Sequence, residues 1–235
     1  MLINLLAGPP FGPRLYDGVC QRLEQCGLNS CTIDPFSECD NTDEMIRWME
    51  QRIKPGDALV AHGTAVPLAV AVTQNKQIET LFLSNGPIKK PDPILNLYGK
   101  TPVSLRKALL NPFCSIPALK SSAGLRRLVV NPYVMDRDTI VRVCEPLIKS
   151  KNHRRRYAEY IGKIDRMTPL AQPGANKICL IWGDSDLLYP THHASSVLSG
   201  WKNTIAVEIE GAKHLHPIES PWAMADIIKS QIVHP

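Results

Sequence analysis

The sequence predicts an α/β fold with a mostly parallel sheet, helices on both faces of the sheet and an inserted helical cap. Short apolar runs typical of buried strands alternate with helical segments over residues 1–86 and again over residues 174–235. Between these parts, residues 87–173 lose the alternation and are rich in proline and basic residues. We therefore predict a core built from residues 1–86 and 174–235, with residues 87–173 as the cap.

The first part of the core has a regular order of strands and helices. Apolar runs that stop at glycine, proline or polar residues predict strands, and the segments between them predict helices. The helix near Asp43 has a start signal, because Asn41 can cap it and Glu44 is placed to complete a capping box. The expected strands span residues 2–7, 30–34, 57–61 and 79–84, and the expected helices span residues 13–26, 43–52 and 66–72.

The alternation resumes after the cap. The expected strands span residues 177–182 and 204–208, and the expected helices lie near residues 192–199 and over residues 221–233. Within the cap, residues 102–110 and 138–148 read as short amphipathic pieces. The core is therefore expected to be split by the insertion.

The composition limits the class of protein. A chain of 235 residues with 44% hydrophobic residues can bury a full core. No apolar run approaches the roughly 20 residues that a membrane span needs, and the apolar N-terminal run lacks a basic leader. The seven cysteines are scattered and never spaced as C-x-x-C, which indicates free thiols and no zinc site. We therefore expect a cytoplasmic globular protein.

Positive charge is concentrated in the cap. Residues 87–173 hold 17 Lys and Arg against six Asp and Glu, a balance of +11 in a chain whose net charge is +5. The densest cluster lies between Lys149 and Arg156. It is interpreted either as the solvated face of a helix or as a surface that attracts an anionic substrate. No aromatic interleaving accompanies it, so we expect no nucleic-acid partner.

A sharp turn is predicted where the third expected strand runs into the next helix. In a strand-turn-helix segment of the G-x-S-x-G type, the residues two before and two after the apex must be small, because the backbones nearly touch. Ala61 and Ala65 meet this demand if Gly63 is the apex, whereas Thr64 as the apex would bring bulkier side chains to these positions. The turn is therefore predicted to be a nucleophile elbow whose apex carries no side chain.

Two further turns place polar residues at the carboxyl ends of expected strands, where parallel sheets carry their sites. The first has a G-x-x-D-x-x-x-P pattern, formed by Gly183, Asp186 and Pro190. The second has a G-x-x-H-x-x-x-x-E-x-P pattern, formed by Gly211, His214, Glu219 and Pro221. Together with the turn at Gly63, these patterns occur in the order apex, acid, histidine.

In these three ordered segments the chain resembles the α/β-hydrolase superfamily, over nearly all of its length outside the cap. The resemblance implies that Asp186 is the triad acid and His214 the triad histidine. It also implies that Gly63 stands where the family has its nucleophilic serine. Two of the three triad positions are thus expected to be filled.

A second departure from the family concerns the loop after the first strand. Family members have His-Gly-x there, with a backbone N–H near x that binds the developing oxyanion, and the matching residues are Ala7, Gly8 and Pro9. Proline has no N–H to donate, which leaves the N–H of Thr64 as the remaining donor. Loss of one such donor costs about 100- to 1000-fold in rate. We therefore do not expect a conventional serine esterase.

Several other polar residues are candidates with alternative interpretations. Asp184 would be the acid if the turn were placed two residues earlier, and the Thr64 hydroxyl or the cap residue Cys114 could replace the missing nucleophile. Cys114 could equally be a small buried residue.

The remaining histidines are given structural interpretations. His62 is expected to pack behind the elbow. His216 and the pair His192 and His193 lack a matching carboxylate or cysteine spacing, so no metal site is expected.

Three functions are compatible with these residues. The first is a cofactor-independent enzyme in which Asp186 and His214 form a non-covalent general base for a lyase, cyclase or water-mediated hydrolase reaction. Its small, largely apolar substrate would lie under the cap, against Gly63, Thr64, Gly8 and Pro9. The alternative is a catalytically inactive hydrolase homologue that binds a ligand or a protein partner and retains His214 for structure. An assembly subunit, in which the fold alone matters, is a weaker third hypothesis.

Overall fold

The computed structural model describes residues 1–91 and 93–233 of the chain. These residues form a six-stranded sheet in which every pair of neighbouring strands is parallel. From edge to edge, the strands are β2 (Ser30–Ile33), β1 (Ile3–Ala7), β3 (Ala58–His62), β4 (Ile78–Ser84), β5 (Ala175–Gly183) and β6 (Thr204–Ile209). The predicted α/β fold with a mostly parallel sheet is confirmed.

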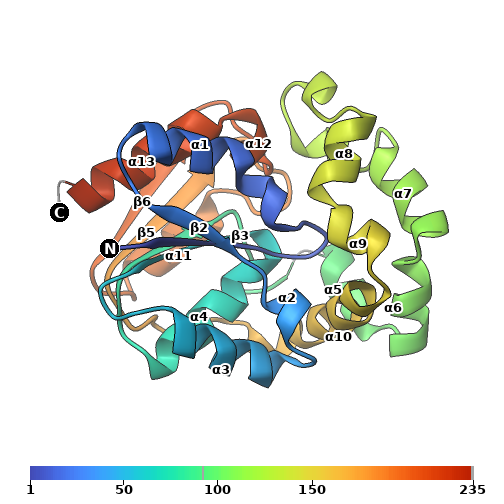
Figure 1. Ribbon diagram of the computed structural model, residues 1–235, viewed down its shortest axis with the longest axis horizontal. Coiled ribbons are helices and arrows are strands. Elements are labelled where there is room, and N and C mark those ends of the chain that lie inside the picture. The colour runs from blue at the N-terminus through green and yellow to red at the C-terminus, as the bar shows by residue number, and fades with distance from the viewer. Residues whose placement is uncertain (92, 234–235) are drawn as a thin grey trace.

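Helices cover both faces of this sheet (Figure 1). On one face lie α1 (Asp17–Gln25), α12 (His216–Glu219) and α13 (Pro221–Val233). On the other lie α3 (Thr42–Arg52), α4 (Val66–Asn75) and α11 (His192–Leu198). The short helix α2 (Pro35–Glu38) follows β2. The predicted N-terminal cap of helix α3 is present, since the Asn41 side chain accepts a hydrogen bond from the Glu44 N–H at 3.0 Å.

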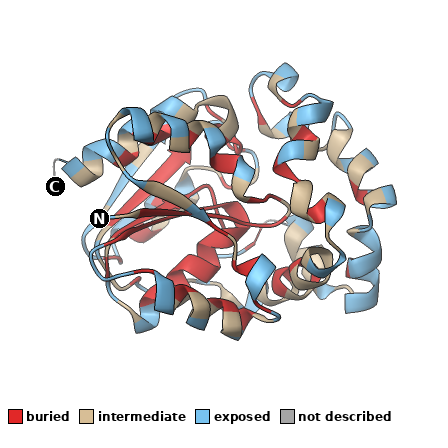
Figure 2. Cartoon of the chain, in the orientation of Figure 1, coloured by how far each residue is buried: buried red, intermediate tan, exposed pale blue. Residues whose placement is uncertain are grey.

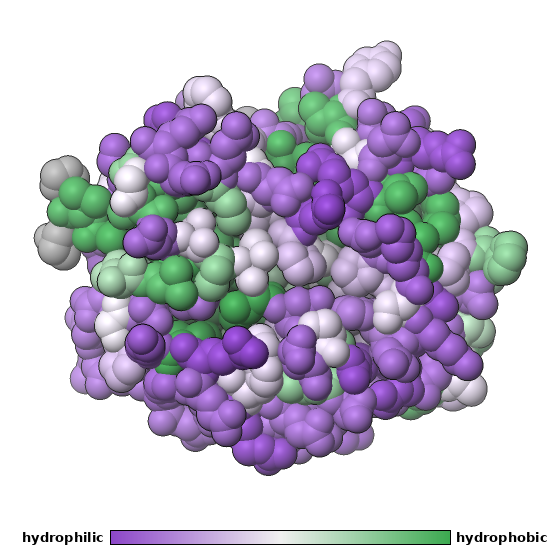
Figure 3. Space-filling model, viewed as in Figure 1, coloured by the Kyte–Doolittle hydropathy of each residue, from purple (hydrophilic) through white to green (hydrophobic). Residues whose placement is uncertain are grey.

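The core consists of two layers separated by the sheet. Because successive strand residues point to opposite faces, Ala58 and Val60 of β3 pack under α1 and α13, whereas Leu59 and Ala61 pack under α3 and α4. Figure 2 shows the inner strands β1, β3 and β4 as almost uniformly buried, whereas the edge strands β2 and β6 are mostly intermediate or exposed. In the face shown in Figure 3, hydrophilic residues cover the outer side of α3, as expected for a helix with one apolar side.

Between β4 and β5 the described residues form helices and no strand. These elements are α5 (Pro93–Lys100), α6 (Val103–Leu109), α7 (Pro112–Lys120), η3 (Leu125–Leu128), η4 (Pro132–Val134), α8 (Arg137–Val143), α9 (Glu145–Lys149) and α10 (Lys151–Met167). They lie together at one side of the molecule (Figure 1). Among all described residues, no helix is both long enough and apolar enough to cross a membrane.

The helix α10 fixes this segment to the core. The Tyr157 hydroxyl donates to the Phe11 carbonyl at 2.9 Å, and the Tyr160 hydroxyl donates to the Thr64 carbonyl at 2.6 Å. On its outer side Arg156 donates to the Phe36 carbonyl at 2.7 Å. Part of the basic cluster between Lys149 and Arg156 therefore holds α10 against the segment after β2.

Two predicted helices differ from the observed ones. The amphipathic piece at residues 138–148 is divided into α8 and α9, because Pro146 has no N–H to continue the hydrogen bonding of α8 and lies instead in the first turn of α9. The helix predicted over residues 13–26 begins as a 3₁₀ turn, η1 (Pro13–Tyr16), and continues as α1. Neither difference moves the strands or the turns that follow them.

Candidate functional site

The three predicted polar turns meet at the carboxyl edge of the sheet. Gly63 begins η2 (Gly63–Ala65) directly after β3, Asp186 follows β5, and His214 follows β6. In a parallel sheet these strand ends share one edge, which is where such folds place ligands. The helices between β4 and β5 contribute the opposite wall of the cavity described below.

Asp186 and His214 form a direct pair. Nδ1 of His214 lies 2.9 Å from Oδ2 of Asp186, and both side chains are buried. The other carboxylate oxygen, Oδ1, accepts a hydrogen bond from the Leu188 N–H at 2.7 Å. The carboxylate therefore fixes the imidazole with Nδ1 as the donor, which leaves Nε2 free to accept a proton.

The pKa of the Asp186 carboxyl is lowered. Burial alone raises it, but the charge and hydrogen bond of His214, together with the backbone N–H groups of Leu188 and Tyr189, outweigh burial. Asp186 is thus ionised at neutral pH. A fixed negative charge at this position stabilises a positive charge on His214 after proton uptake.

Gly63 leaves open space in front of His214. Its φ angle is +60°, in the left-handed region that favours glycine. A Cβ built on Gly63 would lie 3.6 Å from Nε2 of His214, and among the described residues beyond its chain neighbours the only other atom within 4 Å is Cε1 of the same ring. Nε2 of His214 therefore lies across the turn from an empty side-chain position.

The Thr64 hydroxyl is turned away from His214. Oγ1 of Thr64 donates to the Pro9 carbonyl at 2.7 Å. Gly8 lies directly behind, where an added Cβ would come within 2.3 Å of both Oγ1 of Thr64 and the Ala65 nitrogen. The loop after β1 is thus packed tightly onto the turn after β3, with Pro9 lining the cavity and Gly8 behind it.

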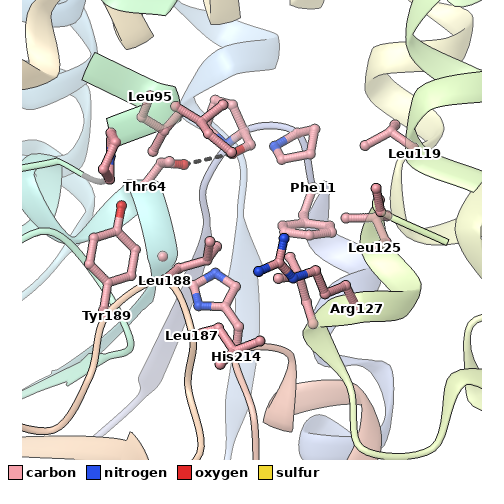
Figure 4. Close-up of a pocket in the computed structure, with 18 residues that line it drawn as sticks. Phe11, Thr64, Leu95, Leu119, Leu125, Arg127, Leu187, Leu188, Tyr189 and His214 are labelled. Atoms are coloured by element: carbon pink, nitrogen blue, oxygen red, sulfur yellow. Dashed lines mark hydrogen bonds between the residues drawn. The ribbon is translucent and has the colours of Figure 1, made fainter. Parts of the chain in front are cut away.

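A cavity of about 430 Å³ lies above the turn and the imidazole (Figure 4). Most of its lining is apolar, and the polar side chains among the described lining residues belong to Thr64, Arg127, Tyr189 and His214. The lining residues are Pro9, Pro10, Phe11, Gly63, Thr64, Pro93, Ile94, Leu95, Leu119, Ala123, Gly124, Leu125, Arg127, Leu128, Leu187, Leu188, Tyr189 and His214. Such a lining suits a small, largely apolar molecule.

Further histidines are buried behind His214. Nδ1 of His62 lies 3.0 Å from the Ser84 hydroxyl, which lies 2.7 Å from Nε2 of His216. Burial, with the charges of His214 and His216, lowers the pKa of His62 well below its usual value. Burial and the charge of His214 lower the pKa of His216 to about 3, against an opposing effect of Asp186. Both imidazoles are thus neutral at physiological pH.

The sequence matches neither a family model nor a curated protein. Solved structures match over nearly the whole chain. An esterase from Thermogutta terrifontis has a TM-score of 0.71 at 12% identity, with 99% of this chain and 89% of that chain covered. A haloalkane dehalogenase from Bradyrhizobium elkani has a TM-score of 0.74 at 10% identity, with 98% and 89% covered. An α/β hydrolase fold protein from Burkholderia ambifaria has a TM-score of 0.67 at 15% identity, with 96% and 88% covered.

The chain has the α/β-hydrolase fold. At these identities the likeness establishes the fold alone. What distinguishes this chain within the fold is therefore the set of side chains at the carboxyl edge of its sheet.

The other sequence candidates lie outside this group of side chains. Asp184 is exposed and accepts a hydrogen bond from the Ser185 hydroxyl at 2.9 Å, so the pair to His214 is made by Asp186 instead. Cys114 is exposed and is not among the described residues that line the cavity, so it is not a small buried residue either. The rings of His192 and His193 lie 4.7 Å apart, but the described residues contain no group of three or more potential metal ligands.

One residue of the site was missed by the sequence patterns. Asn85 follows β4, is fully buried and donates from its amide to Oδ2 of Asp186. Its Oδ1 accepts from the Gly183 N–H at 2.9 Å, and its φ angle is +36°. An asparagine before a glycine at a strand end is a signal for left-handed backbone, but its contact with Asp186 depends on the pairing of β4 with β5.

Proposed function

We propose that this protein is a cofactor-independent enzyme in which Asp186 and His214 act as a non-covalent general base. The observation that carries the proposal is that Nε2 of His214 faces a largely apolar cavity across the open position at Gly63. Neutral His214 would take a proton from a substrate C–H group or from a water molecule. Asp186 would stabilise the resulting imidazolium.

The position of Gly63 supports a route without an acyl-enzyme. A serine there would place its hydroxyl one bond beyond a Cβ that lies 3.6 Å from Nε2, so glycine occupies the position expected of the nucleophile. Among the described lining residues the hydroxyl groups are those of Thr64 and Tyr189, and Thr64 donates to Pro9. Pro9 also lacks the N–H that the resemblance assigns to the oxyanion site. Covalent acyl transfer would thus lack both its nucleophile and one of its donors.

The proposed reactions need only proton transfer at a fixed position. They are elimination, cyclisation or retro-aldol cleavage after removal of a C–H proton, or hydrolysis by a water molecule held above Gly63. An apolar cavity favours them because a base in a low-dielectric site is not solvated by competing water. We further propose that residues 87–173 act as the substrate-covering cap on a core of residues 1–86 and 174–235. With seven free cysteines, a reducing cytoplasm is the proposed location.

A ligand screen tests this proposal. Mixtures of small molecules would be tested for thermal stabilisation of the wild type and of His214→Ala, and each stabilising compound would then be incubated with both proteins and analysed by mass spectrometry. We expect a compound that the wild type converts and His214→Ala binds but does not convert. Full activity in His214→Ala would contradict the proposal.

A second candidate function is a ligand-binding protein without turnover, favoured by the loss of a side chain at Gly63 and of an N–H at Pro9. Both changes are those expected after acyl transfer has been abandoned. Under this alternative, a variant with both His214 and Asp186 replaced would bind the same compounds as tightly as the wild type, and neither protein would convert them.

A further inference from the structure

Arg127 is the cationic side chain among the residues that line the cavity. It lies on η3, and in the view of Figure 4 its guanidinium group points between Phe11 and His214. The surrounding wall is supplied by apolar side chains such as Leu125 and Leu187. A permanent charge is thus brought to a largely apolar cavity that the proposed base also lines.

The guanidinium of Arg127 has no hydrogen bond or ion pair with any described residue. Its neighbour in sequence, Arg126, is also exposed but donates from Nε to the Met135 carbonyl at 3.2 Å. The five donors of Arg127 are therefore available to a ligand. Arg126 provides a natural control, because it has the same charge on the same short helix but does not line the cavity.

The segment that carries Arg127 is tied to the loop that carries His214. The Leu215 N–H donates to the Leu128 carbonyl at 2.9 Å. The Glu219 carboxylate bridges the same two segments, accepting from the Val130 N–H at 2.6 Å and from the Lys213 N–H at 2.9 Å. The backbone next to Arg127 is thus held at a defined position relative to the loop that carries His214, although the Arg127 side chain itself is exposed.

Nothing described in the lining opposes a negative charge. No aspartate or glutamate is among the described lining residues. Asp186, behind the imidazole, has a fully buried side chain whose two oxygens are engaged by His214, Asn85 and Leu188. Among the described lining residues, an anion in the cavity would therefore meet one available cation and no acid.

We propose that Arg127 binds a carboxylate group of the ligand, so that the substrate is a small apolar molecule with one carboxylate. This inference rests on the proposed function, in that it takes the cavity above His214 as the substrate site. A single guanidinium matches a monoanion in charge and pairs with it through two parallel hydrogen bonds. A dianionic phosphate would leave one charge uncompensated among apolar side chains. Binding at Arg127 would hold the apolar body of the substrate toward Nε2 of His214.

Calorimetric titration with a matched pair of ligands tests this inference. Phenylbutyrate and the neutral phenylbutyramide have the same apolar body and differ in charge. We expect the wild type to bind phenylbutyrate about tenfold more tightly, equivalent to about 1.4 kcal/mol. Arg127→Gln should lose this preference, and Arg126→Gln should retain it. Added salt should weaken phenylbutyrate binding and leave the amide unaffected.

Three results would overturn the inference: equal affinity for the two ligands, no measurable binding of phenylbutyrate, or an equal loss of preference in both arginine variants. The measurement involves no turnover, so it separates this inference from the proposed function. If the carboxylate preference depends on Arg127 but His214→Ala keeps full activity, only the proposed base is wrong. If His214→Ala abolishes turnover but the preference is absent, only the carboxylate inference is wrong.

Discussion

The two sides of the cavity floor differ in how their polar groups are used. On one side, Asp186 is surrounded by hydrogen-bond donors and holds His214 with its Nε2 toward the cavity. On the other side, Gly63 presents no side chain and the Thr64 hydroxyl donates to the Pro9 carbonyl. We propose that the first side moves a proton, whereas on the second side the Thr64 hydroxyl is already bonded to the Pro9 carbonyl. This contrast is the physical basis for proposing base chemistry without a covalent step.

Replacing Asp186 should have the largest effect on the proton-transfer side. In Asp186→Asn the side-chain amide can donate to Nδ1, which would move the imidazole proton to Nε2 and remove the acceptor that faces the cavity. We expect turnover of any compound found in the screen to fall by about 100- to 10,000-fold. Steady-state kinetics would measure this. Asp184→Asn is the matched control and should keep wild-type rates; equal losses in both variants would contradict the assigned pairing.

Introducing a serine at Gly63 tests the other side. Gly63→Ser would place a hydroxyl near Nε2 of His214, but without an N–H at Pro9 we expect its esterase rate to be about 100- to 1000-fold below that of a complete site. The assay is release of nitrophenol from nitrophenyl acetate, with Gly63→Ala as the control for the added Cβ. A stoichiometric burst of nitrophenol in Gly63→Ser would show that the oxyanion site is intact.

The strand order and the polar turns were accessible from the sequence, because apolar periodicity and short spacings are local properties. The expected strands at residues 57–61 and 79–84 agree with β3 and β4 to within one residue at each end. The segments around Asp186 and His214 carry spacings that place them at strand ends, and the structure brings these two side chains together.

What the sequence could not predict depends on contacts between distant segments. Asn85 reaches Asp186 because β4 pairs with β5. Arg127 reaches the cavity because the carbonyl of its neighbour Leu128 accepts a hydrogen bond from the Leu215 N–H, which lies 87 positions further along the sequence. Neither contact leaves a periodic or spaced pattern. For the same reason, the basic side chains within residues 87–173 could be counted, but their individual partners could not be assigned.

Acid should destabilise the fold through the histidines behind His214. The pKa of His216 is lowered from 6.5 to about 3, first by burial and then by the charge of His214. Between these two values the unfolded chain binds the additional proton, so this group's contribution to stability is complete above pH 6.5 and is lost as the pH falls toward 3. The loss is at most about 1.4 kcal/mol per pH unit.

Denaturant unfolding of the wild type and of His216→Gln between neutral and acid pH checks this expectation. As the pH falls, the unfolding free energy of the variant should decline less steeply than that of the wild type. The difference in slope corresponds to the uptake of up to one proton on unfolding. The lowered pKa of Asp186 acts in the same direction and is common to both proteins. Identical slopes would mean that His216 is not held neutral.

The smallest expected effect concerns the packing of the loop after β1. Gly8→Ala would push a Cβ into Thr64 and the Ala65 nitrogen, and we expect a loss of about 1–3 kcal/mol in unfolding free energy. Gly56→Ala is the control, since no described residue beyond its chain neighbours lies within 4 Å of its added Cβ, and it should change stability by less than about 0.5 kcal/mol. If both variants were equally stable, the loop would not be closed against the turn.

The most direct test of the proposed base is the opening of nitrobenzisoxazole, a small apolar ring compound. A base removes the ring C–H proton, the N–O bond breaks, and a nitrile and a coloured phenolate form without any nucleophilic attack. We predict that the wild type opens the ring about 100- to 10,000-fold faster than His214→Ala, and that the mass of the wild type is unchanged during turnover. Equal rates in the two proteins, or a covalent adduct on the wild type, would contradict the account.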